Sequence, residues 1–281
     1  MRFFDLHSDT ASICRNKGIM PNDLSLAVST NKGKMFDEWY QCYAVFIEDD
    51  SPDPQKDYAE ILEGFKIKFS GFKKPVPIFT LENASPVTDI EFVDRLADDG
   101  IRSATLTWNG ENTLAGGAYT DVGLKPFGRQ VIEKFNMKHI ACDLSHLNRK
   151  SFFEAGEIAE FVFASHTCCD KTHKHIRNLT DDQIKYIVNR GGVIGLCFYP
   201  DFLGTKYVFE GVWRHINHLL NMGYENSICI GSDFDGAVMS EELDGVDKVP
   251  HLYNFLSERG IPENILDKIF FKNAHNFLSK F

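Results

Sequence analysis

Long hydrophobic runs are missing from this sequence, and so is any surplus of basic residues. Acidic or polar residues interrupt each apolar stretch before it could form a signal-peptide core or a membrane span. The chain has 40 acidic and 30 basic residues, a formal net charge of −10 and no long block of Lys or Arg. Because nucleic-acid binding depends on neutralising phosphates, we expect no nucleic-acid partner. We also expect no membrane partner and a cytoplasmic location.

Cysteines are few and odd in number. Of the seven in the chain, Cys42, Cys142, Cys197 and Cys229 lie inside apolar, strand-like runs, where a thiol behaves as a small buried hydrophobe. This usage indicates a reducing compartment.

The composition is that of a folded protein with a large core. Apolar residues make up 43% of the chain and charged residues 25%. A length of 281 residues is within the range that α/β barrels occupy as one unit, and no repeat, low-complexity tract or linker divides the chain. We therefore expect a single domain over residues 1–281.

Short apolar runs alternate with longer amphipathic segments, which is the pattern of repeated βα units and a parallel sheet. The near-continuous hydrophobicity of the runs suits strands that are buried on both faces. There are about eight, the number that closes a (β/α)8 TIM barrel. The predicted strands are Phe3 to Leu6, Cys42 to Ile47, Val76 to Leu81, Ser103 to Thr107, His139 to Leu144, Phe161 to Ser165, Gly192 to Phe198 and Ile228 to Ser232.

Helices are predicted between the strands wherever apolar residues recur at three- and four-residue spacing. Thr180 and Gln183 have the spacing of a capping box, which indicates a helix start. Additional helices are expected from Pro250 to the C-terminus. The other predicted helices are Asp57 to Phe69, Pro86 to Asp98, Lys125 to Asn136 and Phe209 to Met222.

Residues that can bind metal ions or transfer protons recur at the ends of the predicted strands. The carboxyl ends of barrel strands form the face where active sites are assembled. Histidine together with carboxylate suits zinc or another borderline divalent ion better than calcium. His7 and Asp9 follow the first strand, Glu82 the third, His146 the fifth, His166 the sixth and Asp233 the eighth.

Two features of this set favour a site for two ions. His7 and Asp9 are two residues apart, so in an extended segment they face the same side and can bind one ion. A carboxylate such as Glu82 can bridge two ions about 4 Å apart. Such a pair polarises a carbonyl and activates water, so a serine or cysteine nucleophile is not required.

Several short motifs occur along the chain. They are Asp5-Leu6-His7-Ser8-Asp9, Asp143-Leu144-Ser145-His146, Ala164-Ser165-His166, Ile176-Arg177-Asn178-Leu179 and Gly231-Ser232-Asp233-Phe234-Asp235-Gly236. In this order and at these spacings they resemble the motifs of the membrane dipeptidase (renal dipeptidase) family of amidohydrolase-type barrels. The resemblance extends over almost the whole chain and is to the soluble, bacterial-like members.

The resemblance implies a metallo-dipeptidase with a binuclear zinc site and a metal-bridging hydroxide that attacks the amide bond of a dipeptide. It places His7 and Asp9 on one ion, His146 and His166 on the other, and Glu82 between them. It makes Asp233 the acid and base, and Arg177 the residue that binds the terminal carboxylate of the substrate. By strand parity, Asp235 would share a face with Asp233, so the residues alone leave the choice between these two open. A homodimer is also left open.

The sequence departs from its mammalian-type relatives at Trp108, where a histidine that polarises the scissile carbonyl is expected. Indole has one N–H donor and no titrating group, so Asn109 or the metal ions would have to stabilise the oxyanion. Trp108 and Asn109 are candidate substrate-binding residues, although Trp108 could equally be a hydrophobic lid at the barrel rim. This departure motivates an alternative function, a binuclear hydrolase acting on a lactam, a lactone or another acylated small molecule. A third reading is a non-catalytic barrel that binds a small molecule.

Structural roles remain alternatives for several of these residues. His146 and His166 could be buried core or capping histidines. Glu82 could favour a helix start through the helix dipole. Arg177 could pair with Asp181 or Asp182 on the surface, a contact that contributes little to stability.

Overall fold

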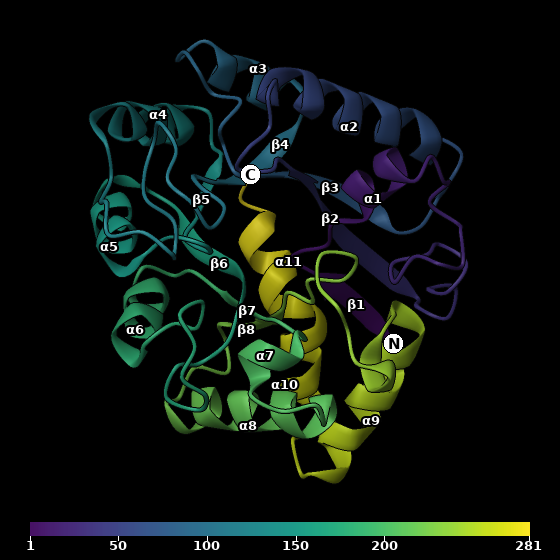
Figure 1. The fold of residues 1–281 in the computed structure, drawn as a ribbon. Coiled ribbons are helices and arrows are strands. Elements are labelled where there is room, and N and C mark those ends of the chain that lie inside the picture. The colour runs from purple at the N-terminus through teal and green to yellow at the C-terminus, as the bar shows by residue number, and fades with distance from the viewer.

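The computed structural model describes all 281 residues and has the predicted barrel. Eight parallel strands pair in sequence order, and the last pairs with the first, so the sheet closes on itself. Figure 1 shows the strands as an inner ring and the helices as an outer ring. The strands are β1 Arg2–Asp5, β2 Glu38–Phe46, β3 Val76–Glu82, β4 Ile101–Thr105, β5 Ala141–Asp143, β6 Val162–Thr167, β7 Ile194–Leu196 and β8 Ile228–Ile230.

Helices follow the strands and cover the outside of the barrel (Figure 1). No helix is both long enough and apolar enough to cross a membrane. The α-helices are α1 Thr10–Asn16, α2 Pro54–Phe69, α3 Phe92–Asp98, α4 Pro126–Met137, α5 Arg149–Ile158, α6 Asp181–Asn189, α7 Pro200–Leu203, α8 Val208–Asn221, α9 Val249–Glu258, α10 Glu263–Asp267 and α11 Asn273–Leu278. Two short 3₁₀ turns, η1 Glu241–Leu243 and η2 Val246–Lys248, and a π-helical turn, η3 Lys268–Lys272, complete the elements.

The capping box that the sequence predicts is present at the start of α6. Gln183 N donates to Thr180 Oγ1 (3.4 Å), and Thr180 N donates to Gln183 Oε1 (3.1 Å). The predicted helix from Pro86 to Asp98 is wrong in its first half, because residues 86–91 form turns. Asp89 Oδ1 accepts a hydrogen bond from Phe92 N (2.9 Å), so the first turn of α3 begins only there.

The C-terminal helices close the lower end of the barrel, opposite the strand ends that carry the candidate site. Phe271 and Phe277 pack with residues that point into the barrel, among them Phe4 and Phe163. The ring centroids of Phe163 and Phe277 are 5.1 Å apart. These apolar side chains close one end of the barrel. The other end, formed by the carboxyl ends of the strands, is open and is called the mouth below.

One buried carboxylate reinforces the closure between β1 and β8. Backbone hydrogen bonds also join the two strand ends, from Leu6 N to Ile230 O (3.0 Å) and from Asp233 N to His7 O (3.2 Å). Only Asp5 and Ile230 are register partners between these strands. Asp5 accepts hydrogen bonds from Ser232 N (2.8 Å), Ser232 Oγ (2.6 Å) and Gln41 Nε2 (2.9 Å). A buried carboxylate must be hydrogen-bonded to be tolerated, and here its partners hold the β8 end against β1 and β2.

Two glycines inside the barrel allow β6, β7 and β8 to approach closely. A Cβ at Gly231 would lie 1.7 Å from Ser165 O, and one at Gly195 would lie 1.8 Å from the same oxygen. No real side chain fits at these distances, so the strands would have to separate.

We expect Gly231→Ala to lower the free energy of unfolding by about 1–3 kcal/mol, because the added methyl overpacks the barrel interior. Urea unfolding followed by circular dichroism measures this. Gly64→Ala in α2 is the matched control. A Cβ there meets nothing within 4 Å, and alanine stabilises a helix by roughly 0.5–1 kcal/mol relative to glycine. A Gly231→Ala protein as stable as the wild type would contradict this account of the barrel interior.

Candidate metal centre and active site

The six side chains that the sequence selected come together at the mouth of the barrel. His7 and Asp9 lie directly after β1, Glu82 ends β3, His146 follows β5, His166 lies in β6, and Asp233 follows β8. The first five are buried, and the Asp233 side chain is 14% exposed. Closure of the sheet therefore gathers residues that are up to 226 positions apart in the chain, from His7 to Asp233.

The first group of potential ligands is His7, Asp9 and Glu82. His7 Nε2 lies 3.4 Å from Asp9 Oδ2 and 3.2 Å from Glu82 Oε2. Neither contact is a hydrogen bond, and His7 Nε2 is buried without a partner, as is the other carboxylate oxygen of Asp9, Oδ1. Buried polar atoms are almost always satisfied, and two that are not, within one group of potential ligands, are consistent with atoms that bind a cation.

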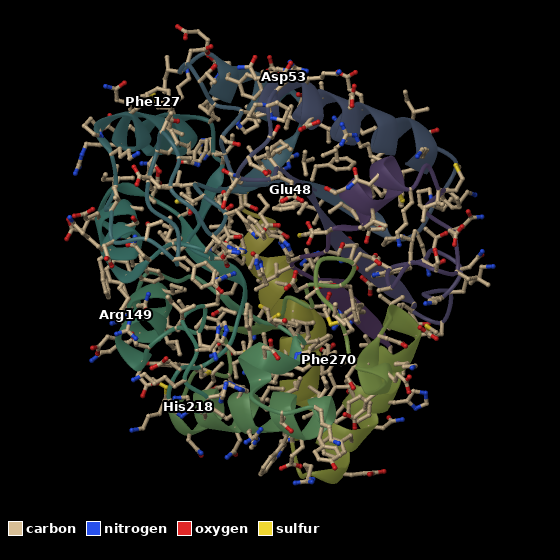
Figure 2. The ribbon with its side chains drawn as sticks, in the orientation of Figure 1. Glu48, Asp53, Phe127, Arg149, His218 and Phe270 are labelled. Atoms are coloured by element: carbon tan, nitrogen blue, oxygen red, sulfur yellow. The ribbon has the colours of Figure 1, made fainter.

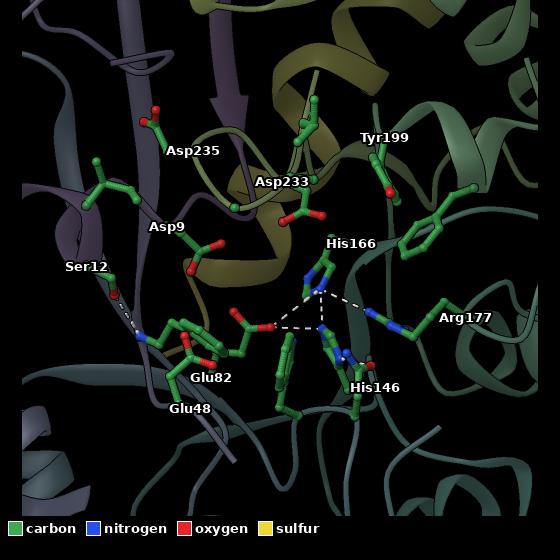
Figure 3. A pocket seen from close by; sticks show the side chains of 18 of the residues that line it. Asp9, Ser12, Glu48, Glu82, His146, His166, Arg177, Tyr199, Asp233 and Asp235 are labelled. Carbon is green, nitrogen blue, oxygen red and sulfur yellow. Dashed lines mark hydrogen bonds and ion pairs between the residues drawn. The ribbon is translucent and has the colours of Figure 1, made fainter. Parts of the chain in front are cut away.

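The second group is Glu82, His146 and His166. His146 Nε2 lies 2.8 Å from Glu82 Oε1 and 2.7 Å from His166 Nε2 (Figure 3). The two groups share Glu82, with Oε2 directed to His7 and Oε1 to His146. A carboxylate between two sets of donors is the arrangement expected of a bridging ligand.

The orientation of both histidine rings is fixed by their Nδ1 atoms. His146 Nδ1 lies 3.0 Å from Asn109 Oδ1, and His166 Nδ1 lies 2.7 Å from Ser165 Oγ. An amide oxygen only accepts, so His146 carries its proton on Nδ1 and presents Nε2 as a lone pair to the site. Metal-binding histidines characteristically use the second nitrogen in this way.

The backbone around the site adopts left-handed conformations. Four of the five non-glycine residues with positive φ lie at the barrel mouth, namely Asn83 (66°), His146 (69°), Asp233 (65°) and Asp235 (65°). This region is unfavourable for residues with a side chain and occurs where the surroundings impose it. It aims the side chains of His146 and Asp233 at the centre of the mouth.

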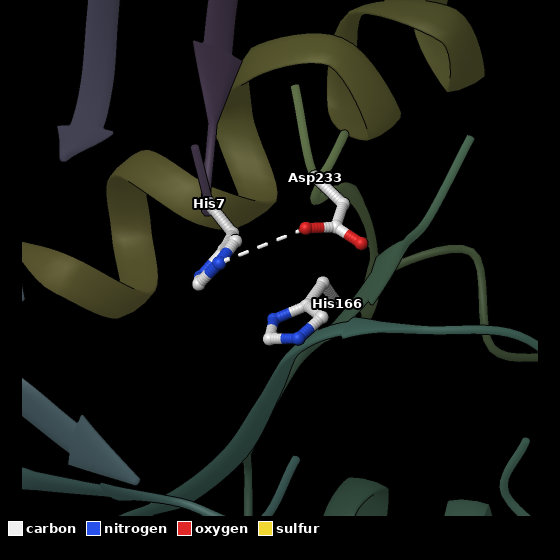
Figure 4. A group of neighbouring side chains, drawn as sticks. All are labelled: His7, His166 and Asp233. Atoms are coloured by element: carbon white, nitrogen blue, oxygen red, sulfur yellow. Dashed lines mark ion pairs between the residues drawn. The ribbon is translucent and has the colours of Figure 1, made fainter. Parts of the chain in front are cut away.

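Asp233 and Asp235 have different surroundings. Asp235 accepts hydrogen bonds from Thr10 Oγ1 (2.7 Å), Ala27 N (2.8 Å) and Val28 N (3.2 Å). It therefore holds the segments around residues 10 and 27 in place. Asp233 Oδ1 instead lies 3.9 Å from His7 Nε2, and its carboxylate faces His7 and His166 (Figure 4). Asp235 is therefore occupied by hydrogen bonds to neighbouring segments, whereas the carboxylate of Asp233 faces the candidate ligands.

Arg177 reaches the site from the loop that follows β6. It is 5% exposed, its Nη2 lies 3.0 Å from His166 Nε2, and its guanidinium lies over the Phe202 ring. The surface pairing with Asp181 or Asp182 that the sequence allowed is not formed, and Asp181 instead accepts from His218 Nε2 (2.7 Å). Arg177 thus places a positive charge at one side of the mouth.

Trp108 and Asn109 form part of the rim. The Trp108 ring packs edge-on against Phe46, with centroids 5.1 Å apart, and lies 6.5 Å from the His146 ring. It lines the cavity. The Asn109 side-chain oxygen is used by His146, so this residue orients a histidine, a role that the sequence did not predict.

Burial keeps two of the histidines uncharged. Burial, together with the charges of His7 and Arg177, lowers the pKa of His146 and of His166 well below its usual value. Neutral imidazole is the form that binds metal ions. Both rings are therefore ready to act as ligands at neutral pH.

The carboxylates are crowded. Burial raises the pKa of Glu82 and of Asp233, and the negative charge of Asp9 raises both further, whereas His7 lowers them. Burial disfavours a protonated His7, but Glu82 and Asp9 outweigh burial and raise its pKa. Like charges this close in a buried site are relieved by protonation or by a bound cation, so the electrostatics of the cluster suit divalent ions.

A glycine provides the space for this crowding. A Cβ at Gly236 would lie 2.0 Å from Asp9 Oδ2 and 2.6 Å from Asp233 Oδ1. Any other residue would push the two carboxylates apart. The space beside Gly236, the shared carboxylate of Glu82 and the unpartnered atoms of His7 and Asp9 together fit two divalent cations.

The cavity at the mouth has a volume of about 500 Å³. This is within the range of about 300–1,000 Å³ that is typical of sites for small molecules. Glu48 and Tyr199 are among the lining residues that sequence reasoning missed. Glu48 follows β2 by two residues, so the strand-end rule that selected the other acids could have found it. Tyr199 gave no comparable signal.

Comparison with known proteins places the chain in a family. The model of the membrane dipeptidase family (Peptidase family M19) matches residues 66–280. An uncharacterized protein of Klebsiella pneumoniae is 32% identical over 189 residues, 62% of this chain and 70% of that protein. An uncharacterized dipeptidase of Schizosaccharomyces pombe is 33% identical over 174 residues, 58% of this chain and 42% of the fungal protein. The match thus spans less than half of that longer relative.

Two solved structures share the fold over nearly their whole length. A dipeptidase described as a metallopeptidase of family M19 has a TM-score of 0.90 at 22% identity, covering 99% of this chain and 98% of its own. A metallopeptidase from Rhodobacter sphaeroides has a TM-score of 0.87 at 20% identity, covering 99% of each chain. Together with the family match over most of the sequence, the site geometry leads to one conclusion: the chain belongs to the membrane dipeptidase family, Peptidase family M19, and is a peptide-bond hydrolase of the metallopeptidase type.

Proposed function

We propose that residues 1–281 form one catalytic domain that hydrolyses the amide bond of dipeptides with the help of two divalent ions, preferably zinc. The observation that carries this proposal is the shared carboxylate of Glu82. His7 and Asp9 would hold one ion, and His146 and His166 the other. Imidazole and carboxylate donors without thiolate are a common zinc set. When bound, two such ions polarise the scissile carbonyl and lower the pKa of the attacking water.

Asp233 would transfer the proton. Its Oδ1 faces the space between His7 and His166, where it can accept a proton from the attacking water and pass it to the nitrogen of the leaving amine. A general acid and base must lie within hydrogen-bond reach of both. Burial and Asp9 raise the pKa of Asp233, which favours the protonated form that the second half of this transfer requires.

Arg177 would bind the terminal carboxylate of the substrate. Its planar guanidinium can donate two parallel hydrogen bonds to a carboxylate. Arg177 is next to His166, so a bound carboxylate would lie close to the scissile bond. A carboxylate held there leaves room for one residue after that bond, as a dipeptide has.

A relative supports this substrate class. The Rhodobacter sphaeroides metallopeptidase was solved with a phosphinate mimic of the dipeptide L-Ala-D-Ala. The alternative substrates, a lactam, a lactone or another acylated small molecule, are not favoured by the family match. A non-catalytic barrel is not favoured either, since every ligand position and the proton-transfer aspartate are present. Hydrolysis of a dipeptide panel with added Zn²⁺, Mn²⁺ or Co²⁺ tests the proposal, and no hydrolysis with any metal would contradict it.

We expect Asp233→Asn to lower kcat for a dipeptide by about 10²–10⁴-fold, because an amide cannot accept the proton of the attacking water. Steady-state kinetics with zinc-loaded protein measures this. The melting temperature and the zinc content of the variant serve as controls, and both should stay close to those of the wild type. A folded, zinc-loaded variant that keeps most of its activity would rule out the role given to Asp233.

We expect Arg177→Met to lower kcat/KM for a dipeptide with a free terminal carboxylate by about 10–100-fold, the effect of losing a charge-assisted hydrogen bond. The same dipeptide with an amidated C-terminus is the matched substrate. It lacks the charge that Arg177 would bind, so the substitution should change its hydrolysis little. An equal loss for both substrates would mean that Arg177 supports the site and does not select the carboxylate.

A further inference from the structure

Five carboxylates line the cavity, and four of them have an evident use. Asp9 and Glu82 belong to the ligand groups, Asp233 faces the histidines, and Asp235 is hydrogen-bonded to Thr10 and to backbone N–H groups. The fifth is Glu48. Its carboxylate makes no hydrogen bond and no ion pair.

The backbone that carries Glu48 is held firmly on both sides. Ile47 N donates to Glu82 O (3.1 Å), and Ile47 O accepts from Asn83 Nδ2 (2.9 Å). On the other side, Asp49 Oδ2 accepts from Gly110 N (2.7 Å). Glu48 is therefore presented at a fixed position beside the end of β3, with a side chain that is free to bind.

Glu48 and Arg177 lie on opposite sides of the mouth. Glu48 follows β2 and Arg177 follows β6, and in a closed ring of eight strands these two are diametrically opposed. Figure 3 shows Glu48 and Arg177 at the two sides of the cavity, with His146 and His166 nearer to Arg177. Figure 2 shows Glu48 over the barrel, whereas Asp53, only five residues later, lies at the outer edge. The cavity is thus negative at one end and positive at the other.

Apolar surface lies beside Glu48. Ile13 of α1 and Phe46 at the end of β2 line the same cavity, and Phe46 N donates to Ser12 Oγ (3.2 Å), which holds α1 against this strand end. A lysine or arginine side chain has an apolar stem and a charged end. Its stem matches Ile13 and Phe46, and its charge matches Glu48.

We propose that Glu48 selects dipeptides whose amino-terminal residue carries a cationic side chain, lysine or arginine. This inference rests on the proposed dipeptidase function, in which Arg177 binds the carboxylate at the other end of the substrate. The α-amino group is two bonds from the scissile carbonyl carbon, so it stays near Asp9 and Asp233. Glu48 is exposed at the rim, where only a long side chain of the first residue reaches.

The surroundings of Glu48 favour a cation. Partial burial, together with Asp50, Asp49 and Asp9, raises the pKa of the Glu48 carboxyl group. A positive charge beside it relieves this repulsion. A negatively charged side chain at the same place would add to it, so a substrate with an amino-terminal glutamate should be disfavoured.

The test compares Lys-Ala, norleucine-Ala and Glu-Ala as substrates of the zinc-loaded wild type, Glu48→Gln and Asp50→Asn. Norleucine has the stem of lysine without its charge. The wild type should prefer Lys-Ala over norleucine-Ala in kcat/KM by about two- to fivefold, the effect of one solvent-exposed ion pair. In Glu48→Gln this ratio should fall towards one. Asp50→Asn removes the same charge from an exposed neighbour that does not line the cavity, so it should keep the wild-type ratio.

Binding without turnover gives a second measurement. Inhibition constants of two phosphinate dipeptide mimics, with lysine or norleucine side chains at the first position, should differ by a similar factor in the wild type and Asp50→Asn but not in Glu48→Gln.

The outcomes separate the two proposals. Failure of the wild type to cleave any of the three dipeptides would count against the proposed function. Cleavage of Lys-Ala and norleucine-Ala at equal efficiency would overturn only the role of Glu48. An unchanged preference in Glu48→Gln, or an equal loss in Asp50→Asn, would overturn it as well.

Discussion

Electrostatic crowding at the barrel mouth is the constraint on which the rest of the site depends. The carboxylates of Asp9 and Glu82 lie beside His7 in a buried space, and burial raises the pKa of Glu82. Burial also keeps His146 and His166 uncharged, so these rings supply lone pairs and no compensating charge. Divalent cations resolve this conflict, because they bind both carboxylate and neutral imidazole.

The barrel provides the rigidity that such crowding needs. Asp5 fastens the end of β8 to β1 through Ser232, and the residue after Ser232 is the proposed proton-transfer group. Gly231 lets β8 approach β6, and Gly236 leaves room for the carboxylates of Asp9 and Asp233. The left-handed backbone at His146 and Asp233 is tolerated because packing and hydrogen bonds on all sides determine it.

Much of the fold was predictable because a buried parallel strand leaves a clear apolar run. All eight runs correspond to strands, although β5, β7 and β8 are only three residues long. Helix limits were less predictable: α3 begins at Phe92 and not near Pro86, because the Asp89 side chain sets its start. The candidate ligands, which the structure brings together, were found from strand ends and motifs. The orienting role of Asn109 and the free carboxylate of Glu48 depend on loop conformations. Hydrogen bonds between residues far apart in the sequence determine these conformations, so no local sequence pattern predicts them.

The central claim is that this mouth binds two divalent ions through a shared Glu82. Elemental analysis of the purified protein, after incubation with Zn²⁺ and removal of excess metal, tests it most directly. The account predicts about two zinc ions per chain for the wild type and fewer for Glu82→Gln, since a neutral amide is a poor bridge. A folded wild-type protein that retains no zinc, or a Glu82→Gln variant with an undiminished content, would contradict it.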